Sequence, residues 1–427
     1  MRHRLLALGL VVMLATLAGC SSSGSTASAA PGSVNLRVTV WTGNAGHLAL
    51  LNSIADAYKK TDPRVGTITF DTLPFDQYST ILTTQLAGGN PPDLGWILEQ
   101  NAPDYIGQGV LADLQPYLST VQGYGLDDLT SSAMSLWTRG NSIYGYPFST
   151  SPYAVFYNAD LFTSAGLQTP DQQLAAGHWN WTTLAADAKA IAAANAGKYG
   201  YIIQDFDYSY WPALAELWRG FGADPWNADG TQCTMTAQPM VDALTFYRNM
   251  VYQDKSVPGP GVVADFFSGQ VGLTSVQISS AQLLKTASFK WGIVPLPAGP
   301  AGDSQVIGQA ALAVFSAGKH KDVAEGFLAF MTNAANTKQL AEYFPPPRKS
   351  LLTSSVLAAA NPLLSAQQLQ SAVINSIESG KVQPSHQNFA QINDAVQAAL
   401  APAWDPTANL QSVLQATCQA LQPLLSH

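Results

Sequence analysis

Residues 36–46 have the sequence LRVTVWTGNAG, which begins as a strand and ends as a turn. In its first half, Leu36, Val38 and Val40 alternate with polar residues, the period of two that is typical of a half-buried strand. Its second half is rich in glycine, which marks a loop. The folded part of the chain is therefore predicted to open with a strand that runs into a surface loop.

The same pattern continues along the next 50 or so residues. Apolar residues recur at helical spacing over 48–58 and again over 78–86, and a second strand pattern lies at 68–70 between them. Glycine and proline at 88–92 end the second helix before a further strand at 93–96. Strands that alternate with helices in this way predict a parallel sheet covered by helices, which is an α/β fold.

The ends of these strands are where a binding site is expected. In open α/β sheets the ligand lies beyond the carboxyl ends of the strands, which here are followed by the loops at 43–44 and 96–101. Charged residues make up only 11% of the chain, whereas Trp and Tyr together number 26. This balance favours a site built from hydroxyls, amides and aromatic faces.

The second half of the chain carries a second α/β pattern. Helix patterns cover 180–194 and 240–251, strand patterns lie at 271–276 and 291–294, and two closing helices fall within 389–421. About 395 residues follow residue 33, more than one hydrophobic core usually serves, so we expect two domains.

The amino-terminal end predicts export. Residues 1–19 combine Arg2 and Arg4 with an uncharged stretch that is too short to span a bilayer, and are predicted to be a signal peptide. The sequence before Cys20, Leu-Ala-Gly, resembles the lipobox of bacterial lipoproteins, which implies a lipid on Cys20; the alternative is an ordinary secretory signal. Residues 20–33 are mostly small and polar and predict a flexible tether.

Charge and motifs exclude several functions. Removal of the signal peptide takes the formal charge from −8 to −10, which makes the mature chain a poor ligand for nucleic acid or anionic membranes. Signatures of serine hydrolases, zinc proteases and nucleotide-binding loops are absent from the sequence, and its histidines are scattered singly. We therefore expect no enzyme activity, no metal and no cofactor. Beyond Cys20 the cysteines are Cys233 and Cys418, which we expect to form a disulfide; the alternative is a buried free thiol.

An ordered set of short motifs resembles the family 1 extracellular solute-binding proteins that serve bacterial sugar importers. These motifs are 38–46, 92–96, 109–114, 145–147, 156–162, 181–184, 243–246, 267–270, 295–297 and 324–330. The resemblance implies a two-lobed periplasmic-binding-protein-like fold of type II, in which each lobe is a mainly parallel sheet flanked by helices. Such a protein is expected to be a monomer that closes like a hinge on its ligand.

The resemblance also implies how the chain divides between the lobes. Residues 34–149 plus 298–335 would form lobe 1, and residues 150–297 plus 336–427 would form lobe 2. Three crossings would then lie near 149–152, 295–298 and 332–339. The partners would be a small sugar and the membrane-spanning permease subunits of an ABC importer, with the chain lipid-anchored on the outside of the cell membrane.

Ligand contacts are transferred from the family by position. The side chains that would contact a sugar are Asn44, Trp96, Glu99, Gln100, Ser151, Tyr208, Trp211, Gln309 and Arg348. Their chemistry suits sugars, because hydroxyls pair with amides and carboxylates while C–H faces pack on aromatic rings. Ser279 stands where many sugar receptors have a tryptophan, so maltodextrin is not specified. The alternatives are a receptor for glycerol-phosphate, a polyamine or a peptide-like solute, and a secreted carbohydrate-active enzyme.

Overall fold

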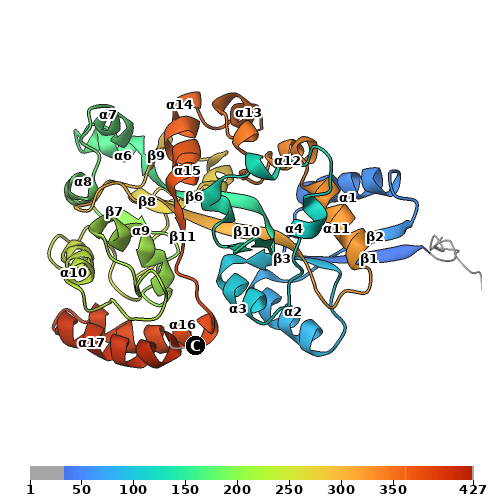
Figure 1. The fold of residues 1–427 in the computed structure, drawn as a ribbon. Coiled ribbons are helices and arrows are strands. Elements are labelled where there is room, and N and C mark those ends of the chain that lie inside the picture. The colour runs from blue at the N-terminus through green and yellow to red at the C-terminus, as the bar shows by residue number, and fades with distance from the viewer. Residues whose placement is uncertain (1–32, 361, 426–427) are drawn as a thin grey trace, which may run out of the picture.

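The computed structural model describes residues 33–360 and 362–425. The predicted signal peptide, most of the tether and Cys20 lie outside the described residues. The described chain forms two lobes side by side, joined by long strands that run between them (Figure 1).

One mixed sheet runs through both lobes in the order β2-β1-β3-β10-β6-β8-β7, with β11 paired to β10 and β9 paired to β6. Its strands are β1 (Val34–Val40), β2 (Val65–Thr72), β3 (Leu94–Leu98), β6 (Tyr146–Asn158), β7 (Tyr199–Ile203), β8 (Val271–Gln277), β9 (Trp291–Pro295), β10 (Val306–Val314) and β11 (Lys381–Val382). A separate hairpin joins β4 (Thr138–Arg139) to β5 (Ser142–Ile143). The pairs β1–β2, β1–β3 and β7–β8 are parallel, as expected for each lobe, and the crossing strands β6 and β10 add antiparallel pairs.

Lobe 1 is built around one buried cluster on β1, β3 and β10. Its helices are α1 (Ala45–Lys59), α2 (Tyr78–Ala87), α3 (Ala102–Gly107), α4 (Gln115–Leu118), α5 (Ser131–Met134), α11 (Lys321–Met331) and α12 (Ala334–Leu340). Helix α1 buries Leu51, Ile54, Ala55 and Tyr58, the face that its spacing predicts. Full burial of one such Leu or Ile side chain stabilises the fold by about 1.5–3 kcal/mol.

Lobe 2 has a buried cluster on each face of its part of the sheet. Its helices are α6 (Ala159–Ser164), α7 (Pro170–Ala175), α8 (Trp181–Ala194), α9 (Ala215–Trp218), α10 (Gln238–Tyr252), α13 (Ser354–Ala360), α14 (Ala366–Gln368), α15 (Asn375–Ser379), α16 (Phe389–Leu400) and α17 (Leu410–Leu421). The structure joins Cys233, in the loop before α10, to Cys418 of α17 in a disulfide with Cα atoms 5.5 Å apart.

The strand contacts place two of the three crossings later than we expected. The first crossing lies within β6, where residues 146–152 pair with β10 and residues 153–158 pair with β8 and β9. The second falls at the start of β10 rather than at 295–298, because Ala298 still contacts Asn180 of lobe 2. Helix α12 packs on α1 and α11, so the third crossing follows residue 340. The exact lobe boundaries stay a prediction.

Within residues 33–360 and 362–425, none of the helices combines the length and the apolar character that crossing a bilayer requires.

Candidate functional site

A cavity of about 1100 Å³ is lined by residues of both lobes and of the strands that join them. Lobe 1 contributes the loops after β1 and β3, as the rule for α/β sheets predicts. Lobe 2 contributes the loop after β7 and the segment after β8. The polar and aromatic residues of the lining include Trp41, Asn44, His47, Phe75, Glu99, Gln100, Phe148, Tyr153, Asp205, Tyr210, Gln277, Gln282, Lys285, Gln309, Glu342, Tyr343, Phe344 and Gln383.

A chain of hydrogen bonds connects the two lobes along this cavity. The Gln100 amide of lobe 1 donates to the Tyr210 hydroxyl of lobe 2 at 2.8 Å, and that hydroxyl donates to Gln383 at 3.0 Å. The Gln383 amide in turn donates to the Tyr153 hydroxyl at 2.9 Å, which also accepts from Gln277 at 3.1 Å. These amides and hydroxyls form a polar part of the cavity that both lobes share. We call these five residues the polar chain.

Glu99 is the most deeply buried carboxyl group on the cavity wall, with 4% of the residue exposed. Its Oε2 accepts a hydrogen bond from the backbone N–H of Gln309. Burial raises the pKa of Glu99 to about 8, against the opposing effects of this hydrogen bond and of the positive charge on Arg219. At neutral pH the carboxyl is therefore mostly protonated, and it can donate a hydrogen bond as well as accept one.

Aromatic rings form much of the lobe 1 wall. Trp41 lies at the end of β1 with its ring centroid 6.0 Å from that of Phe75, and both rings line the cavity. Phe148 and Phe344 pack edge to face with centroids 5.1 Å apart, and Phe344 also contacts the ring of His47. Rings of this kind offer flat apolar faces to the C–H groups of a sugar.

The lining carries more acidic than basic groups. Glu99, Asp205 and Glu342 line the cavity, and burial raises the pKa of Asp205 as well as that of Glu99. Burial lowers the pKa of His47, which keeps that ring neutral at physiological pH. Among the described lining residues, Lys285 is the one side chain with a permanent positive charge. The cavity thus favours a neutral or cationic ligand over an anionic one.

The structure brings four of the expected contacts to the cavity: Asn44, Glu99, Gln100 and Gln309. Asn44 also caps α1, because its Oδ1 accepts from the backbone N–H groups of the first turn at 2.8 and 3.2 Å. The Gln309 side chain is engaged away from the cavity, since it donates to the Ala133 carbonyl at 2.9 Å and accepts from Trp137 at 3.1 Å. The backbone of Gln309 contributes more to the site than its amide.

Three expected contacts are buried and do not line the cavity. Trp96 and Trp211 are each 1% exposed and belong to the cores of lobe 1 and lobe 2. Trp96 supports the site indirectly, because its ring packs on Trp41 at a centroid distance of 4.9 Å. Ser151 is 2% exposed and accepts from the backbone N–H of Ser279 at 3.4 Å.

In the aromatic stretch at 207–212, Tyr210 lines the cavity and Tyr208 does not. Asp207 holds a tight turn by accepting from the backbone N–H of Tyr210 at 3.1 Å, and Tyr208 takes a positive φ of 71° within it. The Tyr208 ring consequently packs on Phe206 and Trp404, with centroids 5.0 and 5.2 Å away, and its hydroxyl donates to a backbone carbonyl. The sequence marks this aromatic stretch as important, but the turn decides which ring reaches the cavity.

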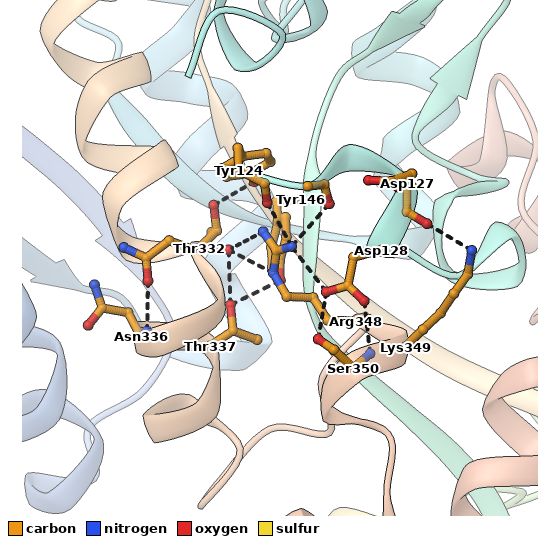
Figure 2. Close-up of polar contacts among 12 residues, drawn as sticks. Tyr124, Asp127, Asp128, Tyr146, Thr332, Asn336, Thr337, Arg348, Lys349 and Ser350 are labelled. Atoms are coloured by element: carbon orange, nitrogen blue, oxygen red, sulfur yellow. Dashed lines mark hydrogen bonds and ion pairs between the residues drawn. The ribbon is translucent and has the colours of Figure 1, made fainter. Parts of the chain in front are cut away.

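Arg348 does not line the cavity either, and its side chain lies among Tyr124, Thr332 and Asp128 (Figure 2). Its guanidinium is fully buried and donates to the backbone carbonyls of Thr332, Tyr124 and Gly125. It also lies over the Tyr124 ring, 4.9 Å from the centroid. The guanidinium N–H groups therefore donate to lobe 1. The side chain holds the segment around residue 348 against that lobe and does not face a ligand in the cavity.

Sequence reasoning missed Tyr153, Gln277 and Gln383, which complete the polar chain. Tyr153 lies in the crossing strand, and Gln383 directly follows the two-residue strand β11. Tyr153 and Gln383 belong to no recognisable sequence motif. They come together only because strands that are distant in sequence pair with one another.

Comparisons with known proteins agree with this architecture. Residues 44–338 match the family model described as bacterial extracellular solute-binding protein. A putative binding protein of Brucella abortus is 28% identical over 331 residues, which cover 74% of this chain and 75% of that protein. The arabinooligosaccharide-binding protein of Bacillus subtilis is 22% identical and covers 91% of this chain and 92% of its own.

A solved structure shares the fold. An ABC substrate-binding protein from Listeria monocytogenes in complex with cycloalternan superposes with a TM-score of 0.78 and is 22% identical, and the match covers 92% of this chain and 99% of that one. Because the family model matches well over half of the sequence, the chain belongs to the bacterial extracellular solute-binding protein family.

Proposed function

We propose that this chain is the extracytoplasmic substrate-binding subunit of an ABC importer and that it binds a carbohydrate in the cavity between its lobes. The observation that carries the proposal is the polar chain, which offers amides and hydroxyls from both lobes next to aromatic rings. Sugars need this combination, because their hydroxyls require paired donors and acceptors while their ring faces are apolar.

The cavity favours an oligosaccharide over a single sugar unit. Its volume of about 1100 Å³ lies above the common range for small-ligand sites, about 300–1,000 Å³. The relatives reported above that are named for a ligand bind oligosaccharides, which supports the same choice. The lining disfavours the glycerol-phosphate alternative, because a phosphate would meet the carboxyl groups of Asp205 and Glu342 and a single lysine, while Glu99 is mostly protonated at neutral pH.

A thermal-shift screen tests this proposal. The compounds to screen are arabino-oligosaccharides, maltodextrins and their monosaccharides. The non-sugar compounds sn-glycerol 3-phosphate and spermidine are included for comparison. A ligand at 100 times its Kd stabilises the native state by about 2.7 kcal/mol, so a true ligand raises the melting temperature clearly. Stabilisation by glycerol 3-phosphate or spermidine alone would contradict the carbohydrate proposal. Chromatography of the incubated oligosaccharide should show no products, and hydrolysis would identify an enzyme instead.

We also propose that the chain is held at the membrane by a lipid on Cys20 and delivers its ligand to separate permease subunits as a monomer. The support is the Leu-Ala-Gly-Cys sequence at 17–20 and the small, polar residues that follow it. Cys20→Ser should move the protein from the membrane fraction to the medium or periplasm. Retention of this variant in the membrane fraction would show that another feature holds it there.

A further inference from the structure

One part of the cavity lining is apolar. Five of its lining residues belong to one buried cluster of lobe 2 and therefore lie together: Val276, Ile278, Leu357, Leu369 and Val373. Each is 2–5% exposed. We call these five residues the apolar wall. It adjoins the polar chain, because Gln277 lies between Val276 and Ile278 in sequence.

Most of this wall comes from one excursion of the chain. Residues 354–374 contain α13, α14 and a π-helical turn, η8 (Leu369–Ile374), which pack on one another. Every described residue of this stretch that lines the cavity is apolar: Leu357, Ala360, Pro362, Leu363, Leu369 and Val373. The π-turn contributes two of them, Leu369 and Val373, and π-turns inside helices occur often at functional sites.

A sugar alone does not match this part of the cavity. A hydroxyl placed against the apolar wall would lose water and find no partner among these aliphatic side chains, which is unfavourable. An apolar group placed there would instead leave water for a matching surface, which is favourable. The segment after β8, which includes Ile278, also places polar side chains on the cavity lining. Two of these, Gln282 and Lys285, are exposed and lie at the edge that faces solvent.

We propose that the ligand of this receptor is a glycoside that carries an apolar aglycone. The sugar part binds the polar chain and the aromatic rings, and the apolar group packs on the apolar wall. This inference rests on the proposed carbohydrate function and adds the chemical class of the ligand. The cavity volume of about 1100 Å³ holds both parts in one continuous space.

The test compares each sugar with its own aryl glycoside. Isothermal titration of the wild-type protein would use glucose, galactose, arabinose and maltose, each beside its 4-nitrophenyl glycoside in both anomeric forms. For the sugar that binds, the aryl glycoside should bind at least tenfold more tightly, a difference of about 1.4 kcal/mol. Equal or weaker binding of both anomers would overturn this inference and leave the carbohydrate proposal standing. The inference would also be overturned if adding one more sugar unit increased the affinity as much as adding the 4-nitrophenyl group does. Failure of every sugar and glycoside here, together with failure of the oligosaccharides in the thermal-shift screen, would overturn both proposals.

Variants place the aglycone. Val373→Thr keeps the shape of the side chain and puts a hydroxyl into the apolar wall, so it should reduce the ratio between glycoside and free-sugar affinity at least threefold. Val396→Thr is the matched control, because Val396 is buried in another cluster of lobe 2 and does not line the cavity. Leu363→Gln, at a half-buried position, gives a second variant with a smaller effect on folding. Ratios that stay at the wild-type value in both cavity variants would overturn the placement.

Discussion

Replacement of Arg348 by alanine should destabilise the fold and spare ligand binding, the reverse of what the resemblance implies. The guanidinium is fully buried and donates twice to the Thr332 carbonyl, at 2.8 and 3.2 Å. It also donates to the carbonyls of Tyr124 at 2.9 Å and Gly125 at 3.2 Å, and lies 3.4 Å from a carboxylate oxygen of Asp128 (Figure 2).

The size of the effect follows from these contacts. Alanine removes this donor from three buried carbonyl groups. The Thr332 carbonyl still accepts from the Thr337 hydroxyl at 3.0 Å, and the Gly125 carbonyl still accepts from the Asp128 backbone N–H at 3.2 Å. A buried group that is left unpaired costs about 1–3 kcal/mol. Asp128 loses less, because its side chain is 23% exposed and also accepts from the backbone N–H of Ser350 at 2.8 Å. Removal of one partner from a buried charged network costs about 3–5 kcal/mol, and we expect Arg348→Ala to fall in that range.

Urea denaturation followed by tryptophan fluorescence measures this loss, and titration at low temperature measures binding by the folded variant. Arg64→Ala is the matched control, because Arg64 also contacts two carboxylates but its side chain is 53% exposed. The control should denature at the wild-type urea concentration. If Arg348→Ala kept wild-type stability and lost ligand affinity, the arginine would be a ligand contact and the structural role that we assign to it would be wrong.

Three further outcomes are expected. Burial raises the pKa of Glu99 to about 8, so its contribution to stability is complete below about pH 4.5 and is lost as the pH rises through 8. The melting temperature of Glu99→Gln should therefore fall less between pH 5 and pH 9 than that of the wild type, and parallel curves would contradict this. Tyr210→Phe should weaken ligand binding by about 0.5–1.5 kcal/mol in calorimetry, whereas Tyr208→Phe should not, and equal effects would place the site elsewhere. Reduction of the bond between Cys233 and Cys418, which are 185 residues apart, should lower the melting temperature, with about 5 kcal/mol as the chain-entropy upper figure; an unchanged melting temperature would refute the stabilising role.

The elements of lobe 1 could be predicted because their signals are local. The alternation in residues 34–40 and the spacing of Leu51, Ile54 and Tyr58 each report the face that β1 or α1 buries. The rule that ligands lie beyond the carboxyl ends of strands leads to the loops at 43–44 and 96–101, and the family resemblance then selects Asn44, Glu99 and Gln100 within them. These three residues line the cavity.

The aromatic contacts could not be predicted in the same way. Strand β3 buries both of its faces, so no alternation shows on which side Trp96 lies. Tyr208 and Tyr210 are two residues apart and would share a face in a regular strand, but the positive φ of Tyr208 separates them. An arginine after three prolines likewise carries no sign that backbone carbonyls from residues 124, 125 and 332 surround it. In each case the deciding partner is distant in sequence.

The polar chain contains residues of both lobes, whereas the apolar wall belongs to one lobe. The two parts of the cavity should therefore affect ligand affinity and lobe closure differently. The polar chain includes Gln100 of lobe 1 and Tyr210 of lobe 2, whereas all five residues of the apolar wall belong to lobe 2. A ligand shifts a conformational equilibrium only through contacts that differ between the two states. Because the wall belongs to one lobe, an apolar group bound there would keep its contacts if the lobes moved apart, so it would add affinity without favouring closure. Under the proposed function, the sugar part alone would contact both lobes through Gln100 and Tyr210, so it would decide whether the lobes close on the ligand.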